Sequence, residues 1–577
     1  MSRLRQFAAS QASDTVGGAT SRAASTGASR TAGPLVAGAF WPGGWSLGAV
    51  AIAALAGLPL AAILVASLAG GMDALAHLAR TVLPLYIANT ALLMVLAGGL
   101  AVVIGTTAAW LVSAAEFPGR RVLSAALVLP LAVPAYIAAY IYADILSFAG
   151  PVQGGLRALT GWGVADYSFP AIRSLPGGAL VLGLVLYPYV YLLARGAFAA
   201  QSLTQFRAAR SLGASPRSAF WRVALPAARP AIAGGLALVL MEVLADFGVA
   251  EYFAIPTFST GIFRSWLAMG DKQAALKLAA MMLVFVAVLV IFEARTRSGR
   301  SASRDGLAMR KGEALITLSP LGRIMAFIAC ALPVLLGFVI PAGWLAWLAT
   351  SDAALAATRA LGEYLRGSLW LGLAAALTCV IAALLLAFAK ARSASPLVNG
   401  AIRLATLGYA LPGALLAVGL LAPLGAFDQS LTRFARDMFG HSGGLLLTGT
   451  SMILIYALSV RFLTVAYNSL DSGLSRIPPN LDAAARSLGA GPARVLARIY
   501  APLLAPSLGA AAALVFIDAL RELPATLILR PFNLETLATR TYRLASDERL
   551  VEASIPALIL LVAGLLPVLL LARTGKR

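Results

Sequence analysis

Twelve apolar stretches follow one another along this chain and constrain its fold more than any other feature. Their centres lie near residues 58, 100, 134, 188, 242, 284, 335, 379, 413, 456, 515 and 562. Each is about 20 residues long, the length that an α-helix needs to cross a bilayer. In hydrocarbon the backbone must satisfy its own hydrogen bonds, which favours helices. The sequence therefore predicts an all-α integral membrane protein with about 12 transmembrane helices.

The composition excludes a soluble protein. Hydrophobic residues make up 60% of the chain, charged residues make up 12%, and the mean hydropathy is +0.85. These values are typical of a protein surrounded by membrane lipid. A net charge of +21 could indicate nucleic acid as a partner. In a chain this apolar, Lys and Arg in cytoplasmic loops explain the charge better, so no nucleic-acid partner is expected.

The sequence offers no pattern for a metal centre, a cofactor or a disulfide framework. Cys330 and Cys379 both lie in apolar stretches, and the two histidines, His77 and His441, are isolated. No nucleophile–histidine–acid set is recognisable, which makes a membrane enzyme the least favoured class. No Gly-x-x-x-x-Gly-Lys-[Ser/Thr] segment occurs, so any ATP hydrolysis is expected on a separate subunit.

One short segment occurs twice. Residues 207–214 (RAARSLGA) and 483–490 (AAARSLGA) lie 276 positions apart. Each copy predicts a helix, a turn at Gly213 or Gly489, and a second short helix. A proline at the first position of that helix, Pro216 or Pro492, needs no backbone N–H there. A second proline, Pro226 or Pro502, predicts its end.

The repetition extends beyond these segments. Asn89-Thr90 resembles Gly367-Ser368, and Pro134 matches Pro412, both at a spacing of 278 residues. Six spans per half would give the two halves the same orientation, as in parallel repeats. We therefore expect a six-helix domain at 46–293, a cytoplasmic linker at 294–320 and a second six-helix domain at 321–577. Residues 1–45 predict a disordered cytoplasmic tail, although a transit peptide has a similar composition.

The distribution of basic residues predicts that both termini are cytoplasmic. Lys and Arg are more frequent in the segments that this orientation places inside, and the loop 195–229 holds six arginines and no acid. The outer loop 521–550 carries five arginines and weakens the contrast locally. With this orientation both repeated loops lie on the cytoplasmic side.

Four acidic residues lie inside predicted spans. Glu242 and Asp246 are four positions apart, and Asp518 and Glu522 repeat the same spacing in the second half. This spacing puts both carboxylates of a pair on one helix face, and intramembrane acids generally mark functional sites. We expect the inner pair, Glu242 and Asp518, to face a path for a small, highly charged cation. Alternatively, the acids pair with bases such as Arg521 and hold helices together.

Tyrosines and outer-loop charges give weaker signals. Tyr136 and Tyr140 are one turn apart and Tyr187, Tyr189 and Tyr191 cluster around Pro188, but tyrosine is common at membrane interfaces. Arg264 matches Arg540 and Asp271 matches Asp547 at the 276-residue spacing. These arginines could grip carboxylates of a soluble binding protein. Solvated loop charges are the alternative.

The repeated loops resemble the EAA signature of ABC-importer permeases, Glu-Ala-Ala, three residues, Gly, nine residues, Ile-x-Leu-Pro. The matching residues are Ala208, Ala209, Gly213, Val223, Leu225 and Pro226, then Ala484, Ala485, Gly489, Ile499 and Pro502. Arg207 and Ala483 replace the family's Glu, and Ala501 replaces its Leu. The resemblance implies that both loops dock on an ATPase.

Further stretches resemble fused permeases of ferric-iron importers. They are Leu129-Pro-Leu-Ala-Val-Pro-Ala-Tyr136, Leu244-Ala-Asp-Phe-Gly248, Pro256-Thr-Phe-Ser-Thr-Gly261 and Arg521-Glu-Leu-Pro-Ala-Thr526. This resemblance implies a bacterial inner-membrane protein that works with a homodimeric cytoplasmic ABC ATPase and a periplasmic substrate-binding protein. ATP binding would then drive alternating access.

Other cargoes and another transporter class remain open at this point. Thiamine, phosphonate and polyamine permeases are alternatives within the ABC class. A secondary transporter of twelve spans also has parallel six-span halves, but it runs on an ion gradient and needs no cytoplasmic helix-turn-helix in each half.

Overall fold

The computed structural model describes residues 44–574 except 69–71, 200–202, 302–315, 394, 441–444 and 479. The predicted N-terminal tail and most of the predicted linker lie outside these residues. The described part is built from helices, and its one β-type contact is an isolated bridge between Ala115 and Ile316.

Eleven helical segments of the described chain are long and apolar enough to cross a membrane. They are α1 (Gly44–Leu68), α3 (Leu83–Ala114), α5–α6 (Ala135–Leu146, Pro151–Thr160), α7 (Leu175–Ala197), α9–α10 (Pro216–Ala219, Leu225–Ala245), α13 (Lys272–Ser301), α14–α15 (Pro320–Val334, Ile340–Leu348), α16–α17 (Asp352–Ala356, Leu361–Arg392), α19 (Gly413–Phe439), α20 (Ser451–Leu474) and α27 (Leu550–Thr574). A twelfth, α22–α24, is bent by 75° between Leu503 and Ala505. The prediction of an all-α membrane protein with about 12 spans is confirmed.

Two predicted spans are displaced from their expected centres. Pro134 and Pro412, which the sequence placed within spans, are the N-cap residues of α5 and α19. A proline at a helix start avoids the lost hydrogen bond that it would cause inside the helix. Each of these spans therefore begins where its centre was expected.

Corresponding helices recur in the same order along the two halves. Helices α3 and α17 both have 32 residues and begin 278 positions apart, at Leu83 and Leu361. The N-terminal residue of α12 (Phe258–Phe263) donates its backbone N–H to Thr90 Oγ1, at 3.3 Å. In the second half the N–H of Leu537, which begins α26 (Leu537–Ser546), donates to Ser368 Oγ at 2.7 Å.

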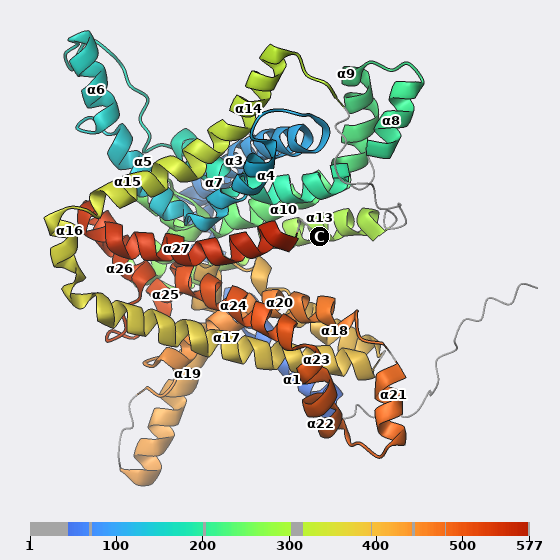
Figure 1. Ribbon diagram of the computed structural model, residues 1–577. Helices are drawn as coiled ribbons and strands as arrows, with labels where there is room; N and C mark the ends of the chain where they lie inside the picture. Colours follow the sequence, from blue (N-terminus) through green and yellow to red (C-terminus); the bar gives the residue numbers. More distant parts are fainter. Residues whose placement is uncertain are drawn as a thin grey trace, which may run out of the picture. The chain divides into compact units, whose positions relative to one another are not determined.

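The first spanning helix of each half packs on the other half. Figure 1 shows α1, in blue, beside α17 and α18 (Pro396–Ala405) of the second half, and α14, in yellow-green, beside α3 and α4 (Arg120–Ala126) of the first. Tyr456 of α20 donates a hydrogen bond to the Leu55 carbonyl of α1 at 2.5 Å. Trp344 of α15 donates to Asp144 of α5 at 2.8 Å. The two halves therefore clasp each other.

The two repeated loops form the predicted helix–turn–helix. Helix α8 (Leu203–Ser211) and helix α21 (Asn480–Ser487) end before Gly213 and Gly489, which have φ angles of +90° and +75°. Glycine is favoured at such angles because it has no Cβ. Figure 1 shows α8–α9 and α21–α22 on the same side of the spanning helices.

The predicted end of the second loop helix is wrong in the first half. Helix α9 continues through a π-helical turn, η3 (Phe220–Ala224), directly into α10, and Pro226 is the second residue of α10. The π turn moves the Leu225 N–H onto the Phe220 carbonyl, so the shift in bonding that a proline requires precedes Pro226. In the second half the helix does break two residues after Pro502, at Leu504.

Candidate functional site

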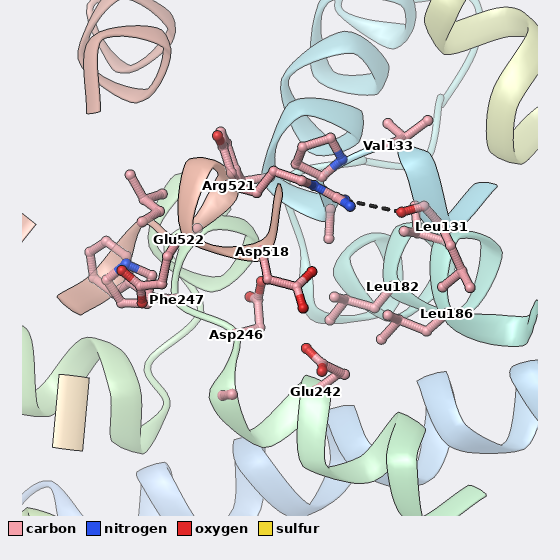
Figure 2. A pocket seen from close by; sticks show the side chains of 18 of the residues that line it. Leu131, Val133, Leu182, Leu186, Glu242, Asp246, Phe247, Asp518, Arg521 and Glu522 are labelled. Atoms are coloured by element: carbon pink, nitrogen blue, oxygen red, sulfur yellow. Dashed lines mark hydrogen bonds between the residues drawn. The ribbon is translucent and has the colours of Figure 1, made fainter. Parts of the chain in front are cut away.

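A cavity of about 210 Å³ lies where helix ends from the two halves meet. The first half contributes the end of α10 and the starts of α5 and α11 (Gly248–Tyr252), and the second contributes the end of α24 (Ala505–Arg521) and the start of α25 (Pro524–Leu529). Its charged lining residues are Glu242, Asp246, Asp518, Glu522, Arg461 and Arg521. Figure 2 shows Glu242, Asp246 and Asp518 turned toward a common space. The structure thus brings all four predicted acids together.

Two of the four acids cap helices. Asp246 follows α10 and accepts the N–H groups of Val249 and Ala250, at 3.5 and 3.0 Å. Glu522 follows α24 and accepts the N–H groups of Ala525 and Thr526, at 3.1 and 3.0 Å. A carboxylate at this position satisfies free donors and complements the helix dipole. Asp246 and Glu522 therefore hold the breaks between consecutive helices.

Glu522 is also the acid that pairs with a base. Arg461 Nη1 of α20 lies 3.4 Å from Glu522 Oε1, and the Glu522 side chain is only 2% exposed. Gly413, the first residue of α19, lies against this pair: a Cβ on it would overlap Glu522 Oε1 and lie 2.7 Å from Arg461 Nη1. The pairing expected as the alternative role thus applies to Glu522, but with Arg461.

The inner pair is the less restrained of the two. Tyr409, in the 3-10 turn η7 (Gly408–Ala410), donates a hydrogen bond of 2.9 Å from its hydroxyl to Glu242 Oε1. Within the described residues the Asp518 carboxylate has no hydrogen bond or ion pair. Glu242 and Asp518 are both partly exposed and line the cavity. Their carboxylates are available to a positively charged ligand.

Arg521, which lines the cavity beside Asp518, is bound elsewhere. Its Nη2 donates to the backbone carbonyl of Leu131 at 3.0 Å, as the dashed line in Figure 2 marks. Leu131 belongs to η1 (Leu129–Ala132) in the first half. The arginine therefore joins the two halves at the cavity wall.

An aromatic cluster adjoins the cavity. Tyr136 lines it, and the Tyr136 ring lies 5.9 Å from that of Tyr140, which lies 4.3 Å from that of Tyr252. The hydroxyls of Tyr136 and Tyr140 are buried and have no hydrogen-bond partner among the described residues. Neither of the other predicted tyrosines at 187 and 191 lines the cavity, whereas Tyr189 does.

The outer-loop charges do not correspond as the sequence spacing suggested. The matching capping boxes start at Thr257 and Thr536, a spacing of 279 rather than 276 residues. By that register Arg264 corresponds to Arg543, and not to Arg540. Three additional residues before α26 cause this shift.

Each of these outer charges has a local role. Arg264 pairs with Glu251 at 3.2 Å, and Arg540 lies 5.2 Å above the Tyr364 ring. Asp271 accepts the Ala274 N–H at 2.9 Å, and Asp547 is the C-cap residue of α26.

The repeated loops present apolar and basic side chains to their surroundings. Arg207, Ala208, Gly213 and Ala484 are exposed, Ala209 is half-buried and Ala485 is buried. Leu212 and Leu488, at the two turns, are 88% and 87% exposed. Large exposed hydrophobic residues at equivalent turns are a feature of protein docking surfaces.

Two residues of the cavity escaped the sequence analysis. Arg461 is the single basic residue within the apolar core of α20, and that isolation was a usable signal. Tyr409 gave none, because its partner Glu242 lies 167 residues away. The described residues contain no group of three or more His, Cys, Asp or Glu side chains placed to hold a metal ion.

Comparison with known proteins places the chain among transport permeases. Residues 101–297 match the family described as binding-protein-dependent transport system inner membrane component. The Fe(3+)-transport system permease protein FbpB 2 of Haemophilus influenzae is 25% identical over 491 residues, 84% of this chain and 89% of that protein.

Two further relatives are named for anions. The sulfate transport system permease protein CysT of Synechocystis sp. is 27% identical over 258 residues, 43% of this chain and 86% of that protein. A probable molybdenum ABC transporter permease of Haloferax volcanii is 33% identical over 190 residues, 33% of this chain and 65% of that protein.

Proposed function

We propose that this chain, an ABC-importer permease with a binding-protein-dependent transport domain at residues 101–297, carries ferric iron across the bacterial inner membrane. The observation that carries the cargo assignment is the charge of the central cavity. Four carboxylates and two guanidinium groups line it, which leaves a formal excess of negative charge. Hard oxygen ligands suit a small, highly charged cation.

The same charge argues against sulfate or molybdate as the cargo. An anion next to Glu242 and Asp518 would be repelled, and both arginines of the cavity are already engaged, by Glu522 and by the Leu131 carbonyl. The relative named for Fe(3+) transport aligns over 84% of this chain, compared with 43% for the sulfate permease. Both facts favour the ferric cargo over the anionic ones.

ATP would be hydrolysed by a separate homodimeric cytoplasmic ATPase that docks on the two repeated loops. The exposed turns at Leu212 and Leu488 lie on the same side of the spanning helices and present similar surfaces. Two equivalent turns suit a partner with two equivalent sockets. With these turns in the cytoplasm, both chain termini would also be cytoplasmic.

A periplasmic binding protein would deliver the cargo on the opposite side, and the exposed or half-exposed charges Arg264, Asp271, Arg540 and Asp547 remain candidates for docking it. Because Arg264 and Arg540 occupy different structural positions, the two lobes of that protein would meet different surfaces. ATP binding would then reorient the halves 46–293 and 321–577 around the central cavity.

Transport measurements test this function. Proteoliposomes with the chain, its ATPase and its binding protein should accumulate radioactive iron supplied as Fe³⁺ when ATP is enclosed, and excess sulfate or molybdate should not compete. The double variant E242Q/D518N should lose most uptake but keep ATPase binding. Uptake that persists without ATP and stops with an ionophore would indicate a secondary transporter instead.

A further inference from the structure

We propose that the cavity binds the ferric ion directly, with Asp518 and the phenolate of Tyr409 as ligands and Glu242 as the acceptor of the Tyr409 proton. This inference rests on the proposed function and specifies the form in which the cargo crosses. The ion would leave its delivering ligands and be held briefly by oxygen atoms of this chain. The site would contain residues of both halves.

The first support is the position of Tyr409. Its hydroxyl donates to Glu242 Oε1 at 2.9 Å, across the interface between the halves. Tyr189 and Tyr409 both lie close enough to Glu242 and Asp518 to interact with them electrostatically. Two phenols and two carboxylates therefore share one region of the cavity. Anionic oxygen donors are the ligands that hard cations prefer.

The second, independent support is the unsatisfied polar lining. The Tyr136 hydroxyl has no partner among the described residues, although the side chain is only 6% exposed and lines the cavity. A buried polar group without a hydrogen bond is costly unless a ligand or water completes it. A cavity lined in this way is suited to a polar or charged occupant.

The local arginines leave the inner acids uncompensated. Arg461 pairs with Glu522, and Arg521 donates to the Leu131 carbonyl. Asp518 has no ion pair among the described residues, and the printed partner of Glu242 is the neutral Tyr409 hydroxyl. The negative charge of these two side chains is therefore left for the cargo.

The proposed ligand exchange is balanced. When Fe³⁺ binds the Tyr409 oxygen, the O–H bond breaks and its proton moves along the existing hydrogen bond to Glu242. When the ion leaves, Glu242 returns the proton to Tyr409. The iron stays ferric, and no reductant or external proton is needed. The bound state carries the neutral acid at Glu242, which leaves Asp518 as the anionic carboxylate ligand.

Visible spectroscopy provides the decisive test, because ferric–phenolate coordination gives a charge-transfer absorption band. The full chain with its ATPase, in lipid nanodiscs, would be titrated with ferric nitrilotriacetate. The wild type should develop the band, and redox-inert Ga³⁺ should suppress it. The variant Y409F should lose the band and take up iron about tenfold more slowly, equivalent to ~1.4 kcal/mol.

A matched control is available in Y456F. Tyr456 also donates one hydrogen bond, to the Leu55 carbonyl, but does not line the cavity. This variant should keep both the band and the uptake rate. In E242Q the band should persist but require a higher pH, because the phenol then has no carboxylate to accept its proton.

The outcomes separate the two proposals. Iron uptake by the wild type without any band, or an unchanged band in Y409F, would overturn direct ligation by Tyr409 and leave the ferric cargo standing. Absence of ATP-driven iron uptake by the wild type would overturn both.

Discussion

Arg521, at the end of α24, donates a hydrogen bond of 3.0 Å to the backbone carbonyl of Leu131, which lies 390 positions earlier in the chain. This bond crosses the interface between the halves at the wall of the central cavity. It connects the last residue of one broken helix to the 3-10 turn that precedes α5. Any relative movement of the two halves at this wall must stretch or break it.

The variant R521M should therefore be less stable. It leaves the Leu131 carbonyl without its donor and removes a charge near Asp518, at a cost of about 1–3 kcal/mol. Thermal unfolding of the purified chain measures the loss. R433M is the control, since exposed Arg433 bonds only to the Gln429 carbonyl of its own helix. Equal unfolding temperatures for both variants would contradict a structural role for the Arg521 bond.

Substitution of Gly413 should disturb the buried ion pair beneath α19. In G413A the new methyl group would press on both Glu522 and Arg461, and overpacking of this kind costs about 1–3 kcal/mol. Unfolding in detergent would show the difference. G425A tests the same change in the same helix, where a Cβ meets only Thr448 at 4.0 Å, and it should be neutral or stabilising. If the two variants behave alike, the close approach at Gly413 is unimportant.

The exposed turns should be required for coupling to the ATPase. The double variant L212D/L488D places charges on two side chains that are 88% and 87% exposed, so the chain itself should fold normally. Co-purification with the ATPase should fall by about tenfold, or ~1.4 kcal/mol. The control is L159D, because Leu159 is 89% exposed at the end of α6, on another part of the molecule. Retained ATPase binding by the double variant would exclude the turns as the docking surface.

The crossing of α1 and α14 predicts that a cut chain stays together. Fragments that end and begin between Ser301 and Ile316, when co-expressed, should co-purify in detergent, because each half holds the first spanning helix of the other. Removal of residues 44–68 from the first fragment should weaken the association, since α1 packs on α17, α18 and α19. Separation of the intact fragments would show that the linker, rather than helix packing, joins the halves.

Hydropathy and spacing predicted the class of fold, the turns at Gly213 and Gly489, and the four acids of the cavity. They could not predict which neighbour each span contacts, because an apolar helix surface carries no record of its partner. The exchange of α1 and α14 was therefore invisible, and so was the contact between Tyr409 and Glu242. Proline at 226 misled because a π turn accommodates it.

The outer charges show a different limit. A constant offset of 276 residues aligned Arg264 with Arg540, but three residues inserted before α26 change the register to 279. Only the capping boxes at Thr257 and Thr536 reveal this, because their hydrogen bonds mark the same point of both helices.

Both guanidinium groups of the cavity come from the second half. At the 276-residue spacing, the counterparts of Arg461 and Arg521 are Val185 and Ala245, which also line the cavity. A transporter assembled from two identical polypeptides would have to repeat every substitution on both sides of its axis. Fusion into one chain removes that obligation, so one wall can carry positive charge while the facing wall carries none. The passage is consequently lopsided, and a migrating cation is drawn off the pseudo-twofold axis toward the amino-terminal half.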